Sequence, residues 1–187
     1  MRIITGKAKG IKLDTLDGLD TRPTAERTKE AIFSALQFDI EGRVVLDLFA
    51  GSGQMGLETL SRGAECAFLV DKSKKAIEII KKNAQKTKLS DACHIVCEDS
   101  IAFLKKHNET IKFDMLFLDP PYATDLINEA LCVLAERKLI KNTSYVVCES
   151  YAFGFLSEQN AKSYEIIKEA KYGIAHITIL KAAEGCL

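Results

Sequence analysis

The sequence predicts an α/β fold with a doubly wound, mostly parallel sheet. Short apolar runs alternate with segments whose apolar residues recur at helical spacing, which is typical of β-α repeats. The first run, 44–49, is nearly unbroken and leads into a glycine-rich turn, as expected for a strand buried on both faces. Two longer β patterns, 164–171 and 174–180, close the chain and are joined near Tyr172-Gly173. We therefore expect seven strands, with an antiparallel hairpin at one edge of the sheet.

The N-terminal part predicts a small β-hairpin followed by a helix. Two β-like pieces, 2–5 and 11–13, flank the connection Gly-Lys-Ala-Lys-Gly. Thr24 is placed to cap a helix whose apolar stripe continues to about Phe38.

The rest of the chain alternates strands and helices. Strands are expected at 66–70, 93–97, 113–118 and 144–148, and helices after residue 53, over 76–87, from 101 and over 126–134. Ligands of such sheets bind at the carboxyl ends of the strands. This rule places Asp47, Asp71, Asp99 and Asp119 along one rim.

Length and composition favour one core domain, 43–187, with the extension 1–42 packed on it. The 187 residues are 47% hydrophobic and 28% charged, and the formal net charge is zero, so any contact with nucleic acid must be local. No apolar run reaches the roughly 18 residues of a membrane span, and the N-terminus lacks a secretory signal. We expect a cytoplasmic monomer without a membrane partner.

The cysteines predict no metal site. Six cysteines, at positions 66, 93, 97, 132, 148 and 186, include no C-x-x-C pair. Cys93, His94 and Cys97 are close in sequence and could suggest a metal site. However, Cys93, Ile95 and Cys97 alternate along a predicted strand, so the two thiols would share one face of it with an apolar residue. We interpret the cysteines as reduced, mostly buried thiols.

A glycine motif follows the first strand and predicts a nucleoside-containing cofactor. Gly51, Gly53 and Gly56 match G-x-G-x-x-G, and Asp71 follows at the distance at which a carboxylate meets ribose hydroxyls. Asp47 adds a negative charge that a pyrophosphate would not favour but that a cationic amine or sulfonium would. A glycine-rich turn without a ligand is the alternative.

The segment from Asp119 to Tyr122, DPPY, predicts a site for an amino group. Pro120 and Pro121 lack N–H donors, so together with Asp119 they present only hydrogen-bond acceptors. Such a surface suits an exocyclic NH2 of a base, and Tyr122 offers a ring on which the base can stack. A proline-rich turn that merely closes the strand is the alternative.

Cations are concentrated near the N-terminus. The residues expected to contact phosphates of an anionic partner are Arg2, Lys7, Lys9, Lys12, Arg22 and Arg27. The alternative is a solvated hairpin tip.

These motifs resemble those of a known family. The segments DLFAGSG from Asp47 and DPPY from Asp119 are similar to the glycine and catalytic motifs of class I S-adenosylmethionine-dependent methyltransferases that act on amino groups, whose fold is Rossmann-like. The flanks resemble the bacterial RsmD family, in RIITG from Arg2, Gly10, RPT from Arg22, KEAIF from Lys29, LSRGA from Leu60, and Tyr172-Gly173. The resemblance implies methylation of guanine N2 in 16S ribosomal RNA, within a small-subunit particle.

The resemblance also implies residue roles. Asp47, Gly51 and Gly53 would line the methionine part of S-adenosylmethionine, Asp71 would hold the ribose, and Asp99 would face the adenine. The cofactor set would further include Phe49, Ser52, Lys72 and Ser100. The segment from Asp119 to Tyr122 would hold the flipped guanine.

Three departures and three rival functions remain. Gln54 and Met55 replace smaller or aliphatic residues of the family, and Ile11 stands where the family often has arginine. An adenine-N6 methyltransferase would use the same acceptor motif. An NAD-dependent oxidoreductase is disfavoured by Asp47 and by the absence of a second catalytic domain, and a non-catalytic RNA-binding module is disfavoured by Asp119.

Overall fold

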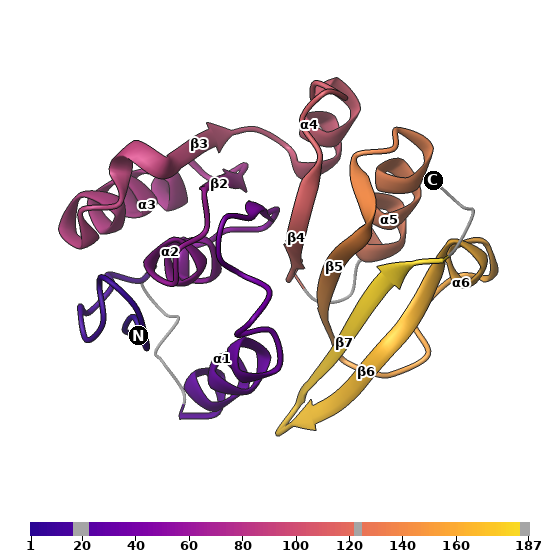
Figure 1. The fold of residues 1–187 in the computed structure, drawn as a ribbon, viewed down its shortest axis with the longest axis horizontal. Helices are drawn as coiled ribbons and strands as arrows, with labels where there is room; N and C mark the ends of the chain where they lie inside the picture. Colours follow the sequence, from indigo (N-terminus) through magenta and orange to yellow (C-terminus); the bar gives the residue numbers. More distant parts are fainter. Residues whose placement is uncertain (17–22, 122–124, 184–187) are drawn as a thin grey trace.

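A computed structural model describes residues 1–16, 23–121 and 125–183, and it contains one seven-stranded sheet (Figure 1). The strands are β1 (Val44–Asp47), β2 (Cys66–Asp71), β3 (Cys93–Cys97), β4 (Phe113–Leu118), β5 (Ile140–Ser150), β6 (Tyr164–Tyr172) and β7 (Ala175–Ala182). Their order is β3-β2-β1-β4-β5-β7-β6; β1 to β5 pair in parallel, and β7 is antiparallel to both of its neighbours. The predicted mostly parallel sheet with a C-terminal hairpin is confirmed.

The helices are α1 (Pro23–Ala35), α2 (Gln54–Ser61), α3 (Lys74–Thr87), α4 (Ser100–Lys106), α5 (Leu126–Glu136) and α6 (Glu158–Ser163), with a 3-10 turn at Ser90–Ala92. Helices α2 to α5 connect the parallel strands, whereas α1 precedes β1 and α6 precedes β6. Local chemistry fixes the ends of α3: the Ser73 hydroxyl accepts the Ala76 N–H, and Lys88 ends the helix in the left-handed conformation.

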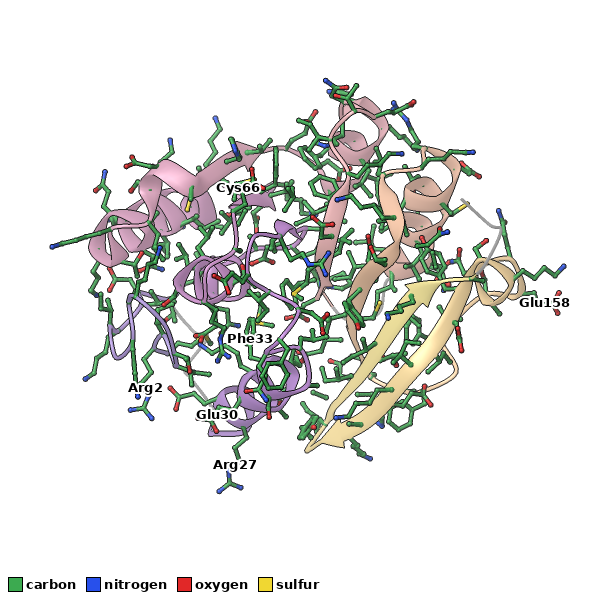
Figure 2. The ribbon with its side chains drawn as sticks, in the orientation of Figure 1. Arg2, Arg27, Glu30, Phe33, Cys66 and Glu158 are labelled. Carbon is green, nitrogen blue, oxygen red and sulfur yellow. The ribbon has the colours of Figure 1, made fainter. Side chains whose placement is uncertain are left out.

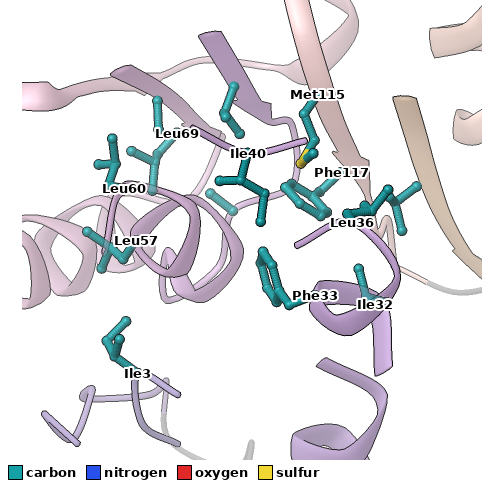
Figure 3. Packing of buried hydrophobic residues seen from close by; sticks show 14 of the residues in the cluster. Ile3, Ile32, Phe33, Leu36, Ile40, Leu57, Leu60, Leu69, Met115 and Phe117 are labelled. Atoms are coloured by element: carbon teal, nitrogen blue, oxygen red, sulfur yellow. The ribbon is translucent and has the colours of Figure 1, made fainter. Parts of the chain in front are cut away.

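The sheet separates two hydrophobic cores. Successive strand residues point to opposite faces, so Val45 packs with α1, α2 and α3, whereas Leu46 packs with α4 and α5. In the first core, Phe33 of α1 faces Phe117 of β4, with ring centroids 5.8 Å apart (Figure 3). This contact fastens the extension to the middle of the sheet.

Several boundaries differ from the prediction. The N-terminal pieces form one isolated bridge, Arg2 with Lys12, instead of two strands. Thr24 lies inside α1 rather than at its cap, because Pro23, whose φ is already helical, occupies the first helical position. The helix ends at Ala35, earlier than predicted, and α6 was not predicted.

Glu58 of α2 holds the N-terminal segment by a buried ionic contact. Its carboxylate accepts the N–H groups of Ile4 and Thr5, at 2.7 and 3.0 Å, and lies 3.4 Å from the ammonium of Lys29. Lys29 and Glu58 are 2% and 0% exposed, so Lys29 is a core residue.

Close backbone packing completes this anchor. A Cβ on Gly6, whose φ is +85°, would stand 1.8 Å from the Ser61 carbonyl oxygen, so only glycine fits there. In the part of the chain that the structure describes, no helix is both long and apolar enough to cross a membrane.

Candidate active site

The carboxyl ends of β1, β2 and β4 meet at one edge of the sheet. Asp47 is the last residue of β1 and pairs in register with Leu69 of β2 and with Phe117 of β4. Asp71 ends β2, and Asp119 directly follows β4. Asp99 follows β3, which pairs in parallel with β2, so all four predicted rim carboxylates lie at the carboxyl ends of adjacent strands.

The glycine turn is folded against Asp71. The Gly51 N–H donates to one carboxylate oxygen of Asp71 at 2.9 Å, and the Ser73 N–H donates to the other at 2.8 Å. These bonds fix the direction of the carboxylate and leave each oxygen a further lone pair, which a ribose hydroxyl could use.

The glycines of the turn differ in what they face. A Cβ on Gly56 would come within 2.8 Å of Leu69, and one on Gly53 within 3.0 Å, so these two residues allow α2 to pack on β2. A Cβ on Gly51, whose φ is +54°, would meet nothing within 4 Å. Gly51 therefore leaves an open face, as a turn that cradles a ligand requires. The neighbouring Ser52 is half-buried, and its carbonyl accepts the Asn83 side-chain N–H at 2.9 Å.

Asp47 is a buried carboxylate at the centre of this rim. It is 4% exposed and accepts the Gly56 N–H at 3.0 Å. Burial, with a smaller contribution from the charge of Asp71, raises the pKa of Asp47 from 3.8 to about 7, although the Gly56 bond opposes the rise. A cationic group placed nearby would stabilise the ionised form, so the site fits an ammonium or sulfonium rather than a pyrophosphate.

Some of the remaining predicted cofactor residues have evident structural roles. Asp99 caps α4 by accepting the N–H groups of Ile101 and Ala102. Ser100 is buried, and its hydroxyl donates to the Leu48 carbonyl at 3.0 Å. Phe49 is half-buried beside the second core, and Lys72 is exposed.

The predicted catalytic motif follows β4. The Asp119 side chain keeps solvent-accessible surface, Pro120 is buried and Pro121 is exposed, whereas Tyr122 lies outside the described residues. Desolvation by the surrounding protein atoms, together with the charges of Glu149 and Asp47, raises the pKa of Asp119 above its ordinary value.

A cavity of about 350 Å³ adjoins this motif. It is lined by Pro120, Pro121, Asp125, Ile127, Asn128, Glu149, Ser150, Tyr151, Ala152, Phe153, Gly154 and Phe155. That volume lies within the ordinary range of small-ligand pockets.

The aromatic part of the wall was missed by the sequence analysis. Tyr151 and Phe153 are 53% and 41% exposed, and Phe153 meets His176 edge-on with ring centroids 4.5 Å apart. The signal was YAFGF, which is separated from the fifth predicted strand by two residues: aromatic residues in a loop at the carboxyl end of a strand.

The predicted RNA-contact residues are spread along the N-terminal extension. Lys7, Lys9, Lys12 and Arg27 are exposed, as is Arg2, which lies 3.8 Å from Glu26; Arg22 is outside the described residues. Arg2 and Arg27 point outward at the same end of the molecule (Figure 2).

Two of these lysines lie away from the rim. The Lys7 N–H donates to the carbonyl of Ser61, the last residue of α2, at 2.8 Å. Because α2 has eight residues, this tip lies about 12 Å along the helix from the glycine turn. The structure therefore does not gather Lys7 and Lys9 around the catalytic motif.

The cysteines require one correction. Among the described cysteines only Cys148 is buried; Cys66, Cys93 and Cys132 are half-buried and Cys97 is exposed. The expectation of mostly buried thiols is thus wrong: Cys93 and Cys97 lie on the edge strand β3, Cys66 begins β2, and Cys132 lies on the partly exposed helix α5. No group of three or more His, Cys, Asp or Glu side chains suited to a metal ion occurs among the described residues.

Known proteins match this chain over most of its length. The family model described as "Conserved hypothetical protein 95" matches residues 1–181. The Bacillus subtilis (strain 168) protein "Putative rRNA methyltransferase YlbH" is 34% identical over 97% of this chain and 98% of its own. The Haemophilus influenzae "Ribosomal RNA small subunit methyltransferase D" is 36% identical over 80% of this chain and 78% of its own.

A solved methyltransferase structure has the same fold as this chain. The protein described as "Putative methyltransferase yhhF" from Escherichia coli superposes with a TM-score of 0.84, at 26% identity and 97% coverage of both chains. The architecture is thus that of the class I methyltransferases. The chain belongs to the RsmD family of methyltransferases, which its glycine motif, its DPPY segment and their flanks had predicted.

Proposed function

We propose that this protein methylates the exocyclic N2 amine of a guanine in 16S ribosomal RNA, with S-adenosylmethionine as the methyl donor. The observation that carries the proposal is the position of Asp119, between an aromatic-lined cavity and the strand that bears Asp47 and the glycine turn. The names of the relatives support ribosomal RNA as the substrate.

The chain's own residues fit this cofactor. When bound, S-adenosylmethionine supplies an electrophilic methyl group on a positively charged sulfur. Asp47 would stabilise the cationic end of the cofactor, and Asp71 would accept hydrogen bonds from the ribose hydroxyls. Because Gly51 has no side chain on its open face, the cofactor could approach the backbone closely there. The other predicted contacts are Phe49, Ser52, Gly53, Lys72, Asp99 and Ser100.

The acceptor segment would orient the target amine. Asp119 and a carbonyl of the Pro120-Pro121 segment accept its two N–H groups and thereby direct the nitrogen lone pair toward the methyl group. As the N–C bond forms, the S–CH3 bond of the donor would break and release S-adenosylhomocysteine, and the nitrogen becomes positively charged and acidic. The raised pKa of Asp119 makes its carboxylate a competent acceptor for the proton that the nitrogen then loses.

The cavity would receive the flipped base. Extrusion of a base from its stack costs a few kcal/mol, which stacking on aromatic rings offsets. Tyr122, Tyr151 and Phe153 are the rings proposed for this contact. The acceptor motif alone would equally suit adenine N6, and guanine is favoured by family membership. We further propose a cytoplasmic monomer that acts on the small-subunit particle rather than on free RNA.

The proposal is tested by separating chemistry from binding. Asp119→Ala should reduce the single-turnover rate about a hundredfold or more, the scale of losing one preorganised electrostatic group. Its affinity for S-adenosylhomocysteine should stay near that of the parent. Tyr122→Ala should weaken productive RNA binding, whereas Tyr122→Phe should retain most activity because the ring provides the stacking.

The matched control is Asp91→Ala, which removes an exposed carboxylate in the 3-10 turn, remote from the cavity. Mass spectrometry of 16S nucleosides identifies the product. Methyl transfer by Asp119→Ala at the parent rate would refute the mechanism, and N6-methyladenine as the product would refute the choice of base.

A further inference from the structure

Positive charge is concentrated in α3 and its two ends. Residues 72–88 contain seven lysines and one acidic residue, Glu78, so they carry +6 while the rest of this neutral chain carries −6. Every one of these lysines is exposed: Lys72, Lys74, Lys75, Lys81, Lys82, Lys86 and Lys88.

The stability of α3 does not explain this charge. Its first turn has no acidic residue and contains Lys74 and Lys75, although the helix dipole disfavours cations at that end. A solvated helix is usually stabilised by alternating Glu–Lys pairs one turn apart. Within the described part of the chain, Lys86 is the only one of the seven with an ion pair, to Asp14 at 3.0 Å. The lysine charges on this helix therefore repel one another, and an anionic partner would reduce that repulsion.

The lysine face is continuous with the N-terminal segment and with the cofactor turn. The Asn83 side chain of α3 accepts the Asp14 N–H at 2.8 Å and donates to the carbonyls of Asp14 and Ser52, both at 2.9 Å. Residues 1–12 add four cations and no acid. Together with Asp14, these two segments carry a net charge of +9, and Asn83 connects the α3 part of this surface to the glycine turn at Ser52.

We propose that the outer face of α3, together with the N-terminal turn, is a second RNA-binding surface that holds backbone phosphates flanking the target nucleotide. This inference rests on the proposed function and extends its substrate. The 14 residues of α3 span about 21 Å, so the surface reaches several phosphates beyond the flipped base. It requires a structured RNA that extends past the active site.

An anionic membrane is the alternative partner for a surface of positive charge, and the chemistry of α3 disfavours it. A helix that lies in a membrane interface inserts large apolar side chains beside its cations. The exposed large apolar side chains of the described residues all lie outside α3. Its buried stripe, which includes Ile77 and Ile80, is already used by the sheet.

The test removes three charges that form no ion pair with described residues and lie outside the cofactor site. In Lys75→Gln/Lys81→Gln/Lys82→Gln, binding to a 16S RNA transcript and to small-subunit particles is measured over a range of salt concentrations. Each lost phosphate contact lowers the slope of log affinity against log salt by about 0.7–0.9, so a change of about 2–3 is expected. At 0.15 M salt, affinity should fall on the order of a hundredfold.

The control is Lys105→Gln/Lys106→Gln/Lys138→Gln, which removes three exposed lysines near α4 and α5, on the other side of the sheet. It should leave the slope unchanged. In the α3 variant, S-adenosylhomocysteine affinity and the single-turnover rate at saturating RNA should match the parent. A short oligonucleotide that carries only the target nucleotide and its neighbours should bind both proteins equally.

An unchanged slope for the α3 variant, or an equal loss in the control, overturns the inference. Lysine-dependent binding to vesicles of anionic phospholipid without lysine-dependent RNA binding overturns it as well. Its failure is separable from that of the proposed function. If the parent methylates no 16S RNA but the α3 variant still loses RNA affinity, the proposed function fails while the binding surface stands.

Discussion

The buried carboxylate of Asp47 should make the cofactor-free protein less stable, at neutral pH, than the same protein with an uncharged side chain at this position. Its pKa is raised from 3.8 to about 7, so the folded protein binds this proton more tightly than the unfolded chain does. Stability with respect to this group therefore falls as pH rises from about 4 to about 7 and is constant above that. A tenfold change in proton affinity corresponds to about 1.4 kcal/mol, so the full cost above pH 7 is about 4 kcal/mol at most.

Asp47→Asn should recover much of that cost. Its amide oxygen can still accept the Gly56 N–H, and it carries no charge to bury. Without cofactor, the variant should be more stable than the parent at pH 8 by about 1–4 kcal/mol and equal to it near pH 4. The same change should weaken binding of S-adenosylmethionine, because the cationic end loses its counter-charge.

The assay is urea denaturation of both proteins at several pH values between 4 and 8.5, with and without S-adenosylhomocysteine. Asp119 is present in both proteins, so the difference isolates Asp47 and its coupling to the rim. A difference that does not grow with pH, or a variant that is less stable at pH 8, would show that the charge at Asp47 is not costly.

Three more predictions follow from particular contacts. Gly56→Ala should destabilise the protein by about 1–3 kcal/mol in denaturant titrations, since its Cβ would stand 2.8 Å from Leu69 and force repacking; a neutral effect would contradict this. Glu58→Ala should cost about 3–5 kcal/mol by leaving the buried Lys29 ammonium uncompensated, and Glu58→Gln should cost less; equal losses would argue against the ionic anchor. Asp119 must be ionised to accept the amine, and its pKa is raised, so kcat/KM should begin to fall at a pH above the ordinary pKa range of an aspartate. Activity should then decrease as pH falls through that pKa. A kcat/KM that stays constant down to pH 5 would contradict the role of Asp119.

The sequence predicted the inner elements of the sheet well. The strands at 93–97 and 113–118 match β3 and β4 residue for residue, because apolar runs between turn residues leave little choice of boundary. Boundaries failed where a single residue overrode the pattern, as when Pro23 took the first helical position and moved Thr24 into α1.

The same contrast holds for the candidate site. The glycine spacing and the order of the carboxylates were visible in the chain, since their positions at strand ends follow from the β-α repeat itself. The sequence could not show that the Ser100 hydroxyl donates to the Leu48 carbonyl, because that contact joins residues 52 positions apart. The cap that Asp99 makes on α4 is local and was missed, although Asp is a common residue at this position.

By itself, the sequence determined the fold class, the family and the positions of the reactive groups along the chain, because local periodicity and short motifs carry that information. Only the tertiary structure decided which charges are available for binding. Lys29 lies in a cationic stretch yet is buried against Glu58, whereas the lysines of α3, typical of a solvated helix in sequence, join the N-terminal cations through Asn83 and Asp14. Burial and pairing arise from contacts between residues distant in sequence, and those contacts determine whether a charged side chain supports the fold or faces a partner.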